Sequence, residues 1–282
     1  MNTLRQIYEL LLFSAKKSYE QMEAEAIARL LTEYLCACGH SDLALDGGRE
    51  VTLEAGRLDR VIKQLEQSRP VQYITAEAYL GDLKFYVDEN VLIPRPETEE
   101  LVRWICSDYR GERPKVLDIG TGSGCIAIYL AKYISASDVD AMDVSQAAIS
   151  VAMRNAAANK VAIKFIEQDI LTSKIVDRYN IIVSNPPYVL DSERQAMRTN
   201  VLDYEPAIAL FVSDQQPLLF YERIARCATV SLNSGGRLYF EINEHYGTEV
   251  KDMLEQLGFD DVQLRKDIFD RDRMVRATWN RG

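Results

Sequence analysis

The strongest candidates for ligand chemistry are five consecutive residues that follow the run Val116–Ile119: Gly120, Thr121, Gly122, Ser123 and Gly124. Glycines at such a turn let the backbone reverse sharply and let a ligand approach the main chain closely. A dinucleotide fingerprint would place its third glycine one position later, at Cys125, and no lysine follows as in a P-loop. Phosphate binding is therefore unsupported. Asp118, two residues before the first glycine, instead suits a ligand that carries an ammonium group and no phosphate, such as S-adenosyl-L-methionine.

Two further acids follow successive predicted strands and fit the same ligand. Asp143 ends the second strand, where a carboxylate can accept hydrogen bonds from both ribose hydroxyls. Asp169 follows the third strand and can accept from an adenine amino group, and Ile170 can pack on the purine face. These positions predict a methyl-donor site that binds S-adenosyl-L-methionine, releases S-adenosyl-L-homocysteine and needs no metal. The alternative is a tight strand–helix turn with no ligand.

A second loop, Asn185-Pro186-Pro187-Tyr188, follows the fourth predicted strand. Two prolines stiffen it, so the Asn185 side-chain oxygen and the Pro186 carbonyl can accept two hydrogen bonds from one –NH₂ group. Tyr188 can lie flat against the planar group that carries the nitrogen. Two acceptors raise the electron density on an otherwise poor amide or amine nucleophile and orient it. We predict that Asn185, Pro186 and Tyr188 are catalytic, that the whole loop binds the acceptor, and that Asn185 also contacts the donor.

Weaker signals come from isolated polar residues. Glu205 and Glu241 are candidates to flank the acceptor pocket, although acids near strand ends are usually surface charges, and Arg95 could steer a ligand or form a salt bridge. Cys36, Cys38 and His40 lack the spaced pairs of a structural zinc site, which favours core packing.

Seven strands with helices between most of them are predicted to position these loops. Their alternation with helices predicts the fold class α/β with a mainly parallel sheet. Together with the predicted methyl-donor site, this alternation leads us to expect a Rossmann-like class I methyltransferase. We place the strands at Val116–Ile119, Val139–Met142, Ile163–Ile166, Asn180–Ser184, Arg237–Ile242, Val262–Lys266 and Met274–Thr278.

The first 70 residues are predicted to be helical only. An apolar stripe within 25–38 predicts one helix that stops at Gly39, and Leu58 to Leu65 predict another that Pro70 ends. Alternation from Leu83 to Val87, followed by a turn at 88–90 and a return at 91–93, predicts a hairpin. The expected domains are a helical bundle at 1–76, a hairpin linker at 77–96 and a methyltransferase domain at 97–282.

The composition excludes several classes of protein. Of the 282 residues, 47% are hydrophobic and 27% charged, which is ordinary for a globular chain. The net charge of −10, with ten basic against fifteen acidic residues in 1–90, disfavours a nucleic-acid partner held through phosphates. The longest uncharged run, Ile119 to Ala131, is far short of the ~20 residues of a membrane span. Five scattered cysteines and no secretory signal lead us to expect a cytoplasmic protein, and nothing suggests an obligate oligomer.

The chemistry of the two loops leaves adenine and glutamine open as acceptors, because both present a planar –NH₂. The sequence as a whole resembles the peptide chain release factor glutamine methyltransferases along nearly its whole length. The matching segments are Pro70–Ile74, Val91–Val102, Val116–Ala131, Ser184–Val189, Tyr204–Leu210, Phe240–Gly247 and Lys266–Trp279. The pair VLIPRPETE and SNPPYV is far more specific than either loop alone.

The resemblance implies methylation of the glutamine in a Gly-Gly-Gln motif of peptide chain release factors, which modulates translation termination, and docking of the release factor by the N-terminal domain. It also implies donor binding at 120–124, Asp143 and 169–170, and glutamine binding at 185–188. Members usually have glycine where this chain has Ala76, and 211–217 lacks the glycines often found there. The rival hypotheses are an adenine amino-group methyltransferase acting on DNA or RNA, and a ribosome-associated binding protein without catalysis.

Overall fold

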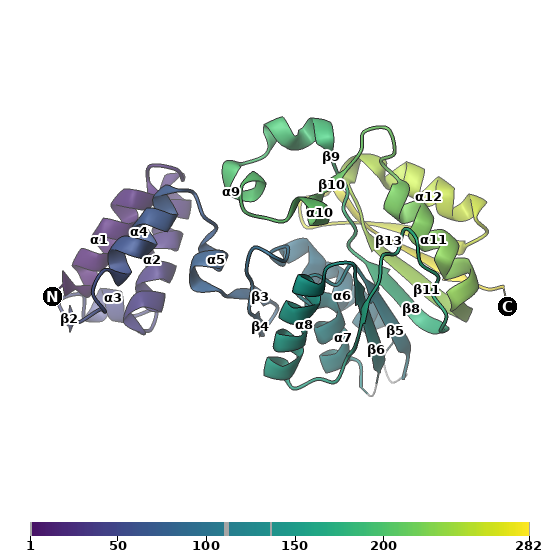
Figure 1. Ribbon diagram of the computed structural model, residues 1–282, viewed down its shortest axis with the longest axis horizontal. Coiled ribbons are helices and arrows are strands. Elements are labelled where there is room, and N and C mark those ends of the chain that lie inside the picture. The colour runs from purple at the N-terminus through teal and green to yellow at the C-terminus, as the bar shows by residue number, and fades with distance from the viewer. Residues whose placement is uncertain (1, 110–112, 136, 282) are drawn as a thin grey trace. The chain divides into compact units, whose positions relative to one another are not determined.

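The computed structural model describes residues 2–109, 113–135 and 137–281, and the chain divides into two units (Figure 1). The first unit comprises residues 1–76 together with 198–204, and the second comprises 77–197 and 205–282. Residues 198–204 thus belong to the first unit although they come from far along the chain. The expected linker at 77–96 lies within the second unit.

The first unit is built mainly from helices that bury one apolar face each. They are α1 (Leu4–Ala15), α2 (Gln21–Cys36), α3 (Asp42–Leu45), α4 (Arg57–Glu66), α5 (Val71–Thr75) and α9 (Thr199–Leu202). Ile7 and Leu11 of α1 pack with Leu31 and Leu35 of α2 and with Leu65 of α4 to form the core. A two-residue pair, β1 (Asn2–Thr3) and β2 (Glu50–Val51), was not expected from the sequence.

The end of α2 corrects one prediction. The helix stops at Cys36 rather than near Gly39, because Ala37 adopts a left-handed conformation with φ of 48°. Gly39 therefore lies beyond the cap, and the cap residue itself, Ala37, is not a glycine that would mark the end of the helix.

The second unit is organised around a seven-stranded sheet. Its order is β12 (Asp260–Lys266), β13 (Asp272–Trp279), β11 (Leu232–Glu241), β8 (Tyr179–Ser184), β5 (Lys115–Ile119), β6 (Asp138–Asp143) and β7 (Lys164–Glu167). All neighbours are parallel except β13, which runs antiparallel to both β11 and β12. Each of the seven predicted strands is present at its predicted place, and the α/β fold class is confirmed.

Alternating residues of the sheet face two separate cores. Val116 and Ile181 pack with α6 (Pro96–Asp108), α7 (Cys125–Tyr133) and α8 (Gln146–Asn159) on one face. Leu117 and Ile182 pack with α11 (Leu219–Ser231) and α12 (Gly247–Gln256) on the other. This is the layered arrangement that alternating strands and helices predict.

The hairpin lies earlier in the chain than predicted. Its strands are β3 (Ala78–Leu80) and β4 (Leu83–Phe85), and Gly81, with φ of 59°, makes the turn between them. Residues 91–93 form no strand, since the Ile93 amide donates to the side chain of Glu205 instead of to a neighbouring strand.

The remaining elements of the second unit lie between β8 and α11 and after β11. They are β9 (Val189–Leu190), the 3₁₀ helix η1 (Asp191–Ala196), α10 (Ala207–Leu210), β10 (Phe211–Val212) and the 3₁₀ helix η2 (Glu244–Tyr246). The glycine-poor stretch that begins at Phe211 is ordered by parallel pairing of β10 with β9.

The carboxyl ends of β5, β6 and β8 are where a ligand site is expected. The chain crosses from one side of β5 to the other, since β6 lies on one side of it and β8 on the other. Ligands of open α/β sheets bind at such a switch point. The Ser184 hydroxyl donates to the carbonyl of Ile119 over 2.7 Å, which fixes the ends of β8 and β5 to each other.

Candidate active site

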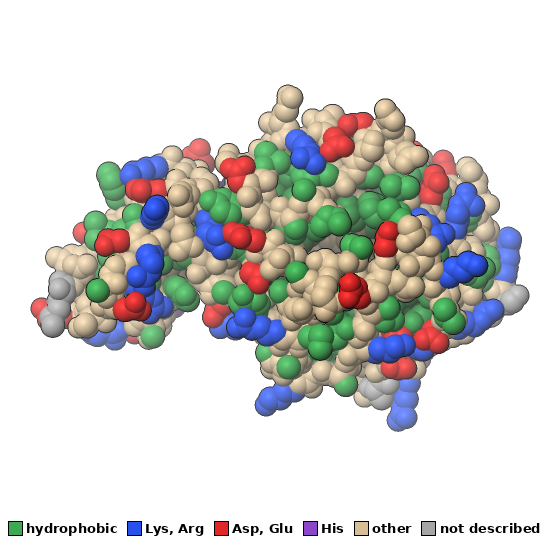
Figure 2. Space-filling model, in the orientation of Figure 1, with side chains coloured by type: hydrophobic (Ala, Val, Ile, Leu, Met, Phe, Trp, Pro, Cys, Tyr) green, Lys and Arg blue, Asp and Glu red, His purple; other side chains and the backbone are tan. Residues whose placement is uncertain are grey.

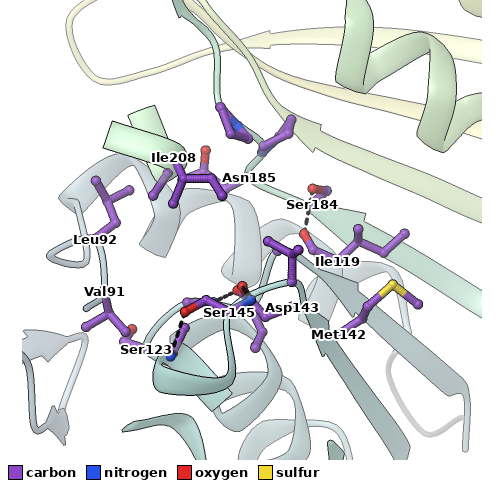
Figure 3. A pocket seen from close by; sticks show the side chains of 18 of the residues that line it. Val91, Leu92, Ile119, Ser123, Met142, Asp143, Ser145, Ser184, Asn185 and Ile208 are labelled. Carbon is purple, nitrogen blue, oxygen red and sulfur yellow. Dashed lines mark hydrogen bonds between the residues drawn. The ribbon is translucent and has the colours of Figure 1, made fainter. Parts of the chain in front are cut away.

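A cavity of about 270 Å³ opens at this edge of the sheet. Most of the predicted site residues line it: Gly120, Thr121, Gly122, Ser123, Asp143, Asp169, Ile170, Asn185, Pro186 and Pro187. Figure 3 shows Asn185 on one side of the cavity and Ser123, Ser145 and Asp143 on the opposite side. Hydrophobic side chains surround a hollow on the face of this unit seen in Figure 2.

The glycine-rich loop is shaped by hydrogen bonds to the end of β6. The amides of Gly120 and Thr121 both donate to the carbonyl of Met142, over 2.8 and 2.9 Å. Gly120 and Gly122 have φ of 72° and 52°, and a Cβ at either would meet no atom within 4 Å. Both glycines are therefore required by the backbone conformation, and the space beside them is left open for a ligand.

Gly124 plays a packing role instead and does not line the cavity. A Cβ on this residue would approach the Cβ of Ala152 to 3.0 Å and the Cδ1 of Ile128 to 3.1 Å. The glycine therefore lets the start of α7 pack closely against α8.

Asp118 lies beneath the loop and does not line the cavity either, which differs from the expectation that it faces the ligand. It is fully buried, and one of its oxygens accepts hydrogen bonds from the Thr121 hydroxyl (2.6 Å) and the Ala127 amide (3.2 Å). Its other oxygen has no hydrogen-bond partner among the described residues. Burial raises the pKa of Asp118 to about 7. In this structure Asp118 joins the loop to the first turn of α7.

Asp143 is half-buried and lines the cavity, and a backbone amide holds each of its carboxylate oxygens. The Gly122 amide donates to Oδ2 and the Ser145 amide donates to Oδ1, each over 2.9 Å. A carboxylate oxygen has a second lone pair, so both oxygens can still accept a hydroxyl hydrogen.

The turn after β7 presents the other acid of the predicted donor site. Oδ1 of Asp169 accepts the Leu171 amide over 2.8 Å, and Arg223 holds the turn by donating to the Ile170 carbonyl over the same distance. Ile170 is 9% exposed and contributes an apolar wall.

The loop after β8 places three of its four residues on the cavity. Asn185, Pro186 and Pro187 line it, while Tyr188 does not. The Asn185 Nδ2 donates to the hydroxyl of Thr98 over 3.4 Å. The Tyr188 hydroxyl donates to Oε1 of Glu241 over 3.1 Å, and the Asn243 side chain donates to the Tyr188 carbonyl. Burial raises the pKa of the Tyr188 phenol, which stays a neutral donor.

Among the described residues that line the cavity, Arg95 is the single Lys or Arg. Its guanidinium donates to Oε1 of Glu205 over 2.5 Å, and Oε2 of the same carboxylate accepts the Ile93 amide over 3.2 Å. Glu205 and Glu241 are 5% and 1% exposed, so neither is the surface charge that the sequence favoured. Glu205 holds the segment before α6 against the cavity.

The cavity fits S-adenosyl-L-methionine in its chemistry. It presents acceptors for ribose hydroxyls at Asp143, an apolar wall with an adjacent acid at 169–170, and open space over two glycines. A carboxylate on the ligand would find a cation at Arg95. Among the described residues, no group of three or more His, Cys, Asp or Glu is arranged to hold a metal ion. Nor does any described helix have the length and apolar character needed to cross a bilayer.

Comparison with known proteins agrees with this geometry. The Methyltransferase small domain matches residues 98–203, and the PrmC N-terminal domain matches residues 13–75. The release factor glutamine methyltransferase of Flavobacterium psychrophilum is 43% identical over 93% of this chain and 94% of its own. That of Bacteroides thetaiotaomicron is 40% identical over 94% and 96%.

The chain belongs to the release factor glutamine methyltransferase family. Solved structures support the fold: a methyltransferase from Pyrococcus furiosus has a TM-score of 0.51 at 19% identity, covering 71% of this chain and 90% of its own. The Thermus thermophilus 16S rRNA N2 G1207 methyltransferase, solved with AdoMet and guanosine, has a TM-score of 0.50 at 18% identity, covering 72% and 49%. This family member therefore has the class I fold and is an S-adenosylmethionine-dependent methyltransferase.

Sequence reasoning missed several residues that complete the cavity in this family member. Thr98, buried to 2% exposure, touches both Asn185 and Glu241. Apolar wall residues come from the segment before α6, from β6 and from α10 and α11: Val91, Leu92, Met142, Ile208 and Phe220. Figure 3 shows Leu92 and Ile208 on the same side of the cavity as Asn185 in this view. The only sequence signal for Thr98 was its place in the specific segment VLIPRPETE.

Proposed function

We propose that this protein transfers a methyl group from S-adenosyl-L-methionine to the side-chain amide nitrogen of the glutamine in the Gly-Gly-Gln motif of peptide chain release factors. The observation that carries the proposal is the placement of Asn185 and Pro186 on the same cavity as the glycine-rich loop and Asp143. The residues proposed to bind the donor and those proposed to accept from the amide thus line one cavity. The membership of the chain in the family supports the choice of glutamine over adenine.

The donor site is assigned to Asp143, to 169–170 and to the open backbone of Gly120 and Gly122. Asp143 would hold the ribose through its hydroxyls, and Ile170 would cover one face of the adenine. S-adenosyl-L-methionine supplies an electrophilic methyl group on a sulfonium. Arg95 would pair with the carboxylate of the amino-acid end, because it is the one Lys or Arg among the lining residues.

The acceptor site is assigned to Asn185 and the Pro186 carbonyl. They accept the two hydrogens of the glutamine –NH₂, which raises the electron density at nitrogen and favours its pyramidal form. The two acceptors also become stronger partners as positive charge grows on nitrogen, so they stabilise the transition state more than the bound substrate. Removing one of them should lower turnover by about 10²–10³-fold, as deletion of a single oxyanion-hole donor does.

Tyr188 is assigned a supporting part in the acceptor site. Its hydroxyl is committed to Glu241 and its carbonyl to Asn243, so both ends of the residue are fixed. We propose that it holds the Asn-Pro-Pro turn in shape. The helical first unit is proposed to bind the release factor, and the enzyme is proposed to act as a monomer.

Peptide mass spectrometry tests the proposal. A purified release factor is incubated with the enzyme and S-adenosyl-L-methionine, and a release factor with alanine for the Gly-Gly-Gln glutamine serves as the substrate control. One added methyl group on that glutamine is expected, with Asn185→Ala slower by about 10²–10³-fold. Asn280→Ala, an exposed change at the far end of β13, should match the wild type.

Duplex DNA in a parallel reaction tests the rival acceptor. A methyl group on adenine with none on the release factor would overturn the choice of substrate while leaving the chemistry of the two loops in place. Transfer to neither acceptor, despite donor binding, would overturn the proposed function.

A further inference from the structure

We infer that Thr98 and Glu241 form a hydrogen-bond relay that sets the orientation of the Asn185 amide, so that its oxygen faces the nucleophile. This inference rests on the proposed function, because it assigns Asn185 to the acceptor site. Thr98 and Glu241 act as positioning residues through Asn185.

The relay joins three separate elements of the second unit. The Thr98 hydroxyl, on α6, donates to Oε2 of Glu241, the last residue of β11, over 2.7 Å. The same hydroxyl oxygen accepts from Nδ2 of Asn185, which follows β8, over 3.4 Å. Thr98 is 2% and Glu241 is 1% exposed, so solvent does not compete for these bonds.

The direction of the relay follows from counting hydrogens. A hydroxyl group has one hydrogen and two lone pairs, and an ionised carboxylate has only acceptors. Thr98 therefore gives its hydrogen to Glu241 and offers a lone pair to Asn185. The group of Asn185 that turns to Thr98 must then be –NH₂, which leaves the side-chain oxygen for the –NH₂ of the substrate.

A hydrogen bond to the other oxygen of Glu241 favours the same direction of the relay. The Tyr188 hydroxyl donates to Oε1 over 3.1 Å, so each carboxylate oxygen accepts one hydroxyl hydrogen. Two donors facing one carboxylate favour its ionised form, in which the relay runs from Asn185 to Thr98 to Glu241.

A neutral group at position 241 would reverse the relay. A protonated carboxyl, or the amide of glutamine, can donate to Thr98, whose own hydrogen then turns to Asn185. The Asn185 oxygen would be drawn to Thr98 and its –NH₂ would face the –NH₂ of the substrate. Two donors would meet at the point where the reaction needs an acceptor.

Glu241 becomes protonated, and the relay reverses, as the pH falls. Burial raises the pKa of Glu241, and Glu97 raises it further, whereas Thr98, Tyr188 and the charge of Arg273 lower it. The titratable and charged groups around Glu241 come from α6, α7, the loop after β8, α11 and β13: Glu97, Cys125, Tyr188, Tyr221 and Arg273. Since the ionised form is the active one, kcat should fall as the pH drops through this raised pKa.

Four variants test the relay in the full-length enzyme, with a release factor as substrate. Thr98→Val removes the hydroxyl at nearly constant volume and should lower kcat about 5–10-fold, the worth of one hydrogen bond. Thr98→Ser keeps the hydroxyl and should retain most of the activity. Glu241→Gln reverses the relay and should lower kcat more than Thr98→Val does, with the acid limb of the kcat–pH profile lost. Asn185→Ala reports on the proposed function itself.

Binding of S-adenosyl-L-homocysteine and the thermal midpoint separate positioning from folding. Both should stay near wild-type values in Thr98→Ser and Glu241→Gln, while kcat alone falls in the latter. If Glu241→Gln keeps the full kcat and an unchanged acid limb of the kcat–pH profile while Asn185→Ala loses most of its kcat, the relay is overturned. The proposed function would then still stand. Full activity of Asn185→Ala would instead remove the proposed function on which the relay rests.

Discussion

Asp143 offers the clearest test of the donor site, because the backbone partner of each of its carboxylate oxygens is known. Each of its oxygens accepts one backbone amide, from Gly122 and Ser145, and has a second lone pair that can accept a ligand hydroxyl. The change Asp143→Asn preserves the size of the side chain but leaves one oxygen where two were needed. The –NH₂ that replaces the other oxygen would face a backbone N–H, which is also a donor.

The expected loss of donor affinity follows from these contacts. A hydrogen bond to a charged group contributes about 1.5–3 kcal/mol. The asparagine loses one such bond to a ribose hydroxyl and weakens the other to a neutral bond, so we expect a loss of about 2–4 kcal/mol. That corresponds to a rise of about 30–1000-fold in Kd.

Isothermal titration with S-adenosyl-L-homocysteine measures this change, because the product analogue binds without turnover. Asp138→Asn is the matched control: it is an exposed aspartate at the opposite end of the same strand, β6, and should leave Kd unchanged. Wild-type affinity in Asp143→Asn, with the control also unchanged, would refute the assignment of the ribose to this carboxylate.

Three further changes test the supporting structure, each by the free energy of unfolding. Ala76 has φ of 56°, so Ala76→Gly should stabilise the first unit by up to about 1 kcal/mol, whereas Ala28→Gly inside α2 should destabilise it. Gly124→Ala should cost about 1–3 kcal/mol, because the new Cβ would lie 3.0 Å from Ala152, whereas Gly48→Ala, whose Cβ meets nothing, should cost little. Burial raises the pKa of Asp118 from 3.8 to about 7, so the carboxyl ionises at a lower pH in the unfolded chain than in the folded one. The free energy of unfolding should therefore fall as the pH rises from 3.8 to about 7. The loss is about 2–4 kcal/mol by pH 7. Because Asp118→Asn does not ionise, its free energy of unfolding should rise relative to that of the wild type over this range, and a constant difference between the two would contradict the prediction.

The central sheet and the two loops could be predicted because their signals are local. Apolar strands such as Lys115–Ile119 and Tyr179–Ser184 alternate with helices. At the ends of these strands, glycine permits a sharp turn and proline fixes φ, so both residue types mark the loops in the sequence. Parallel topology then brings Asp143 and Asn185 to one edge of the sheet without further information.

The buried acids could not be predicted in the same way. Glu205 binds Ile93 and Arg95, more than a hundred residues earlier in the chain, and Glu241 binds Thr98 from a similar separation. A single acid near a strand end is usually exposed, and only its distant partners reveal that it is buried. Resemblance marked the segment that contains Thr98, but the hydrogen-bond network explains what the threonine does.

The end of α2 was misplaced because its cap is not the usual glycine, and α5, which also ends on an alanine cap, was not predicted. Ala37 and Ala76 both adopt left-handed conformations that glycine usually occupies, with φ of 48° and 56°. A rule that looks for glycine passes over them, although each closes its helix by donating its amide to the carbonyl four residues earlier, of Glu33 and of Gln72. The glycine that other family members usually carry at position 76 is the residue that this backbone conformation favours.

The loop after β8 does not by itself decide which acceptor is methylated. The acceptors proposed at Asn185 and Pro186 would fit any planar –NH₂, so the chemistry at the nitrogen does not by itself separate glutamine from adenine. An adenine in duplex DNA would reach this cavity only after flipping out of a helix whose phosphates are held by several cations. Of the described residues that line the cavity, Arg95 alone is a cation. A glutamine on an exposed protein loop needs no such cationic groove. The charge around the cavity, more than the shape of the amide loop, therefore favours a protein acceptor.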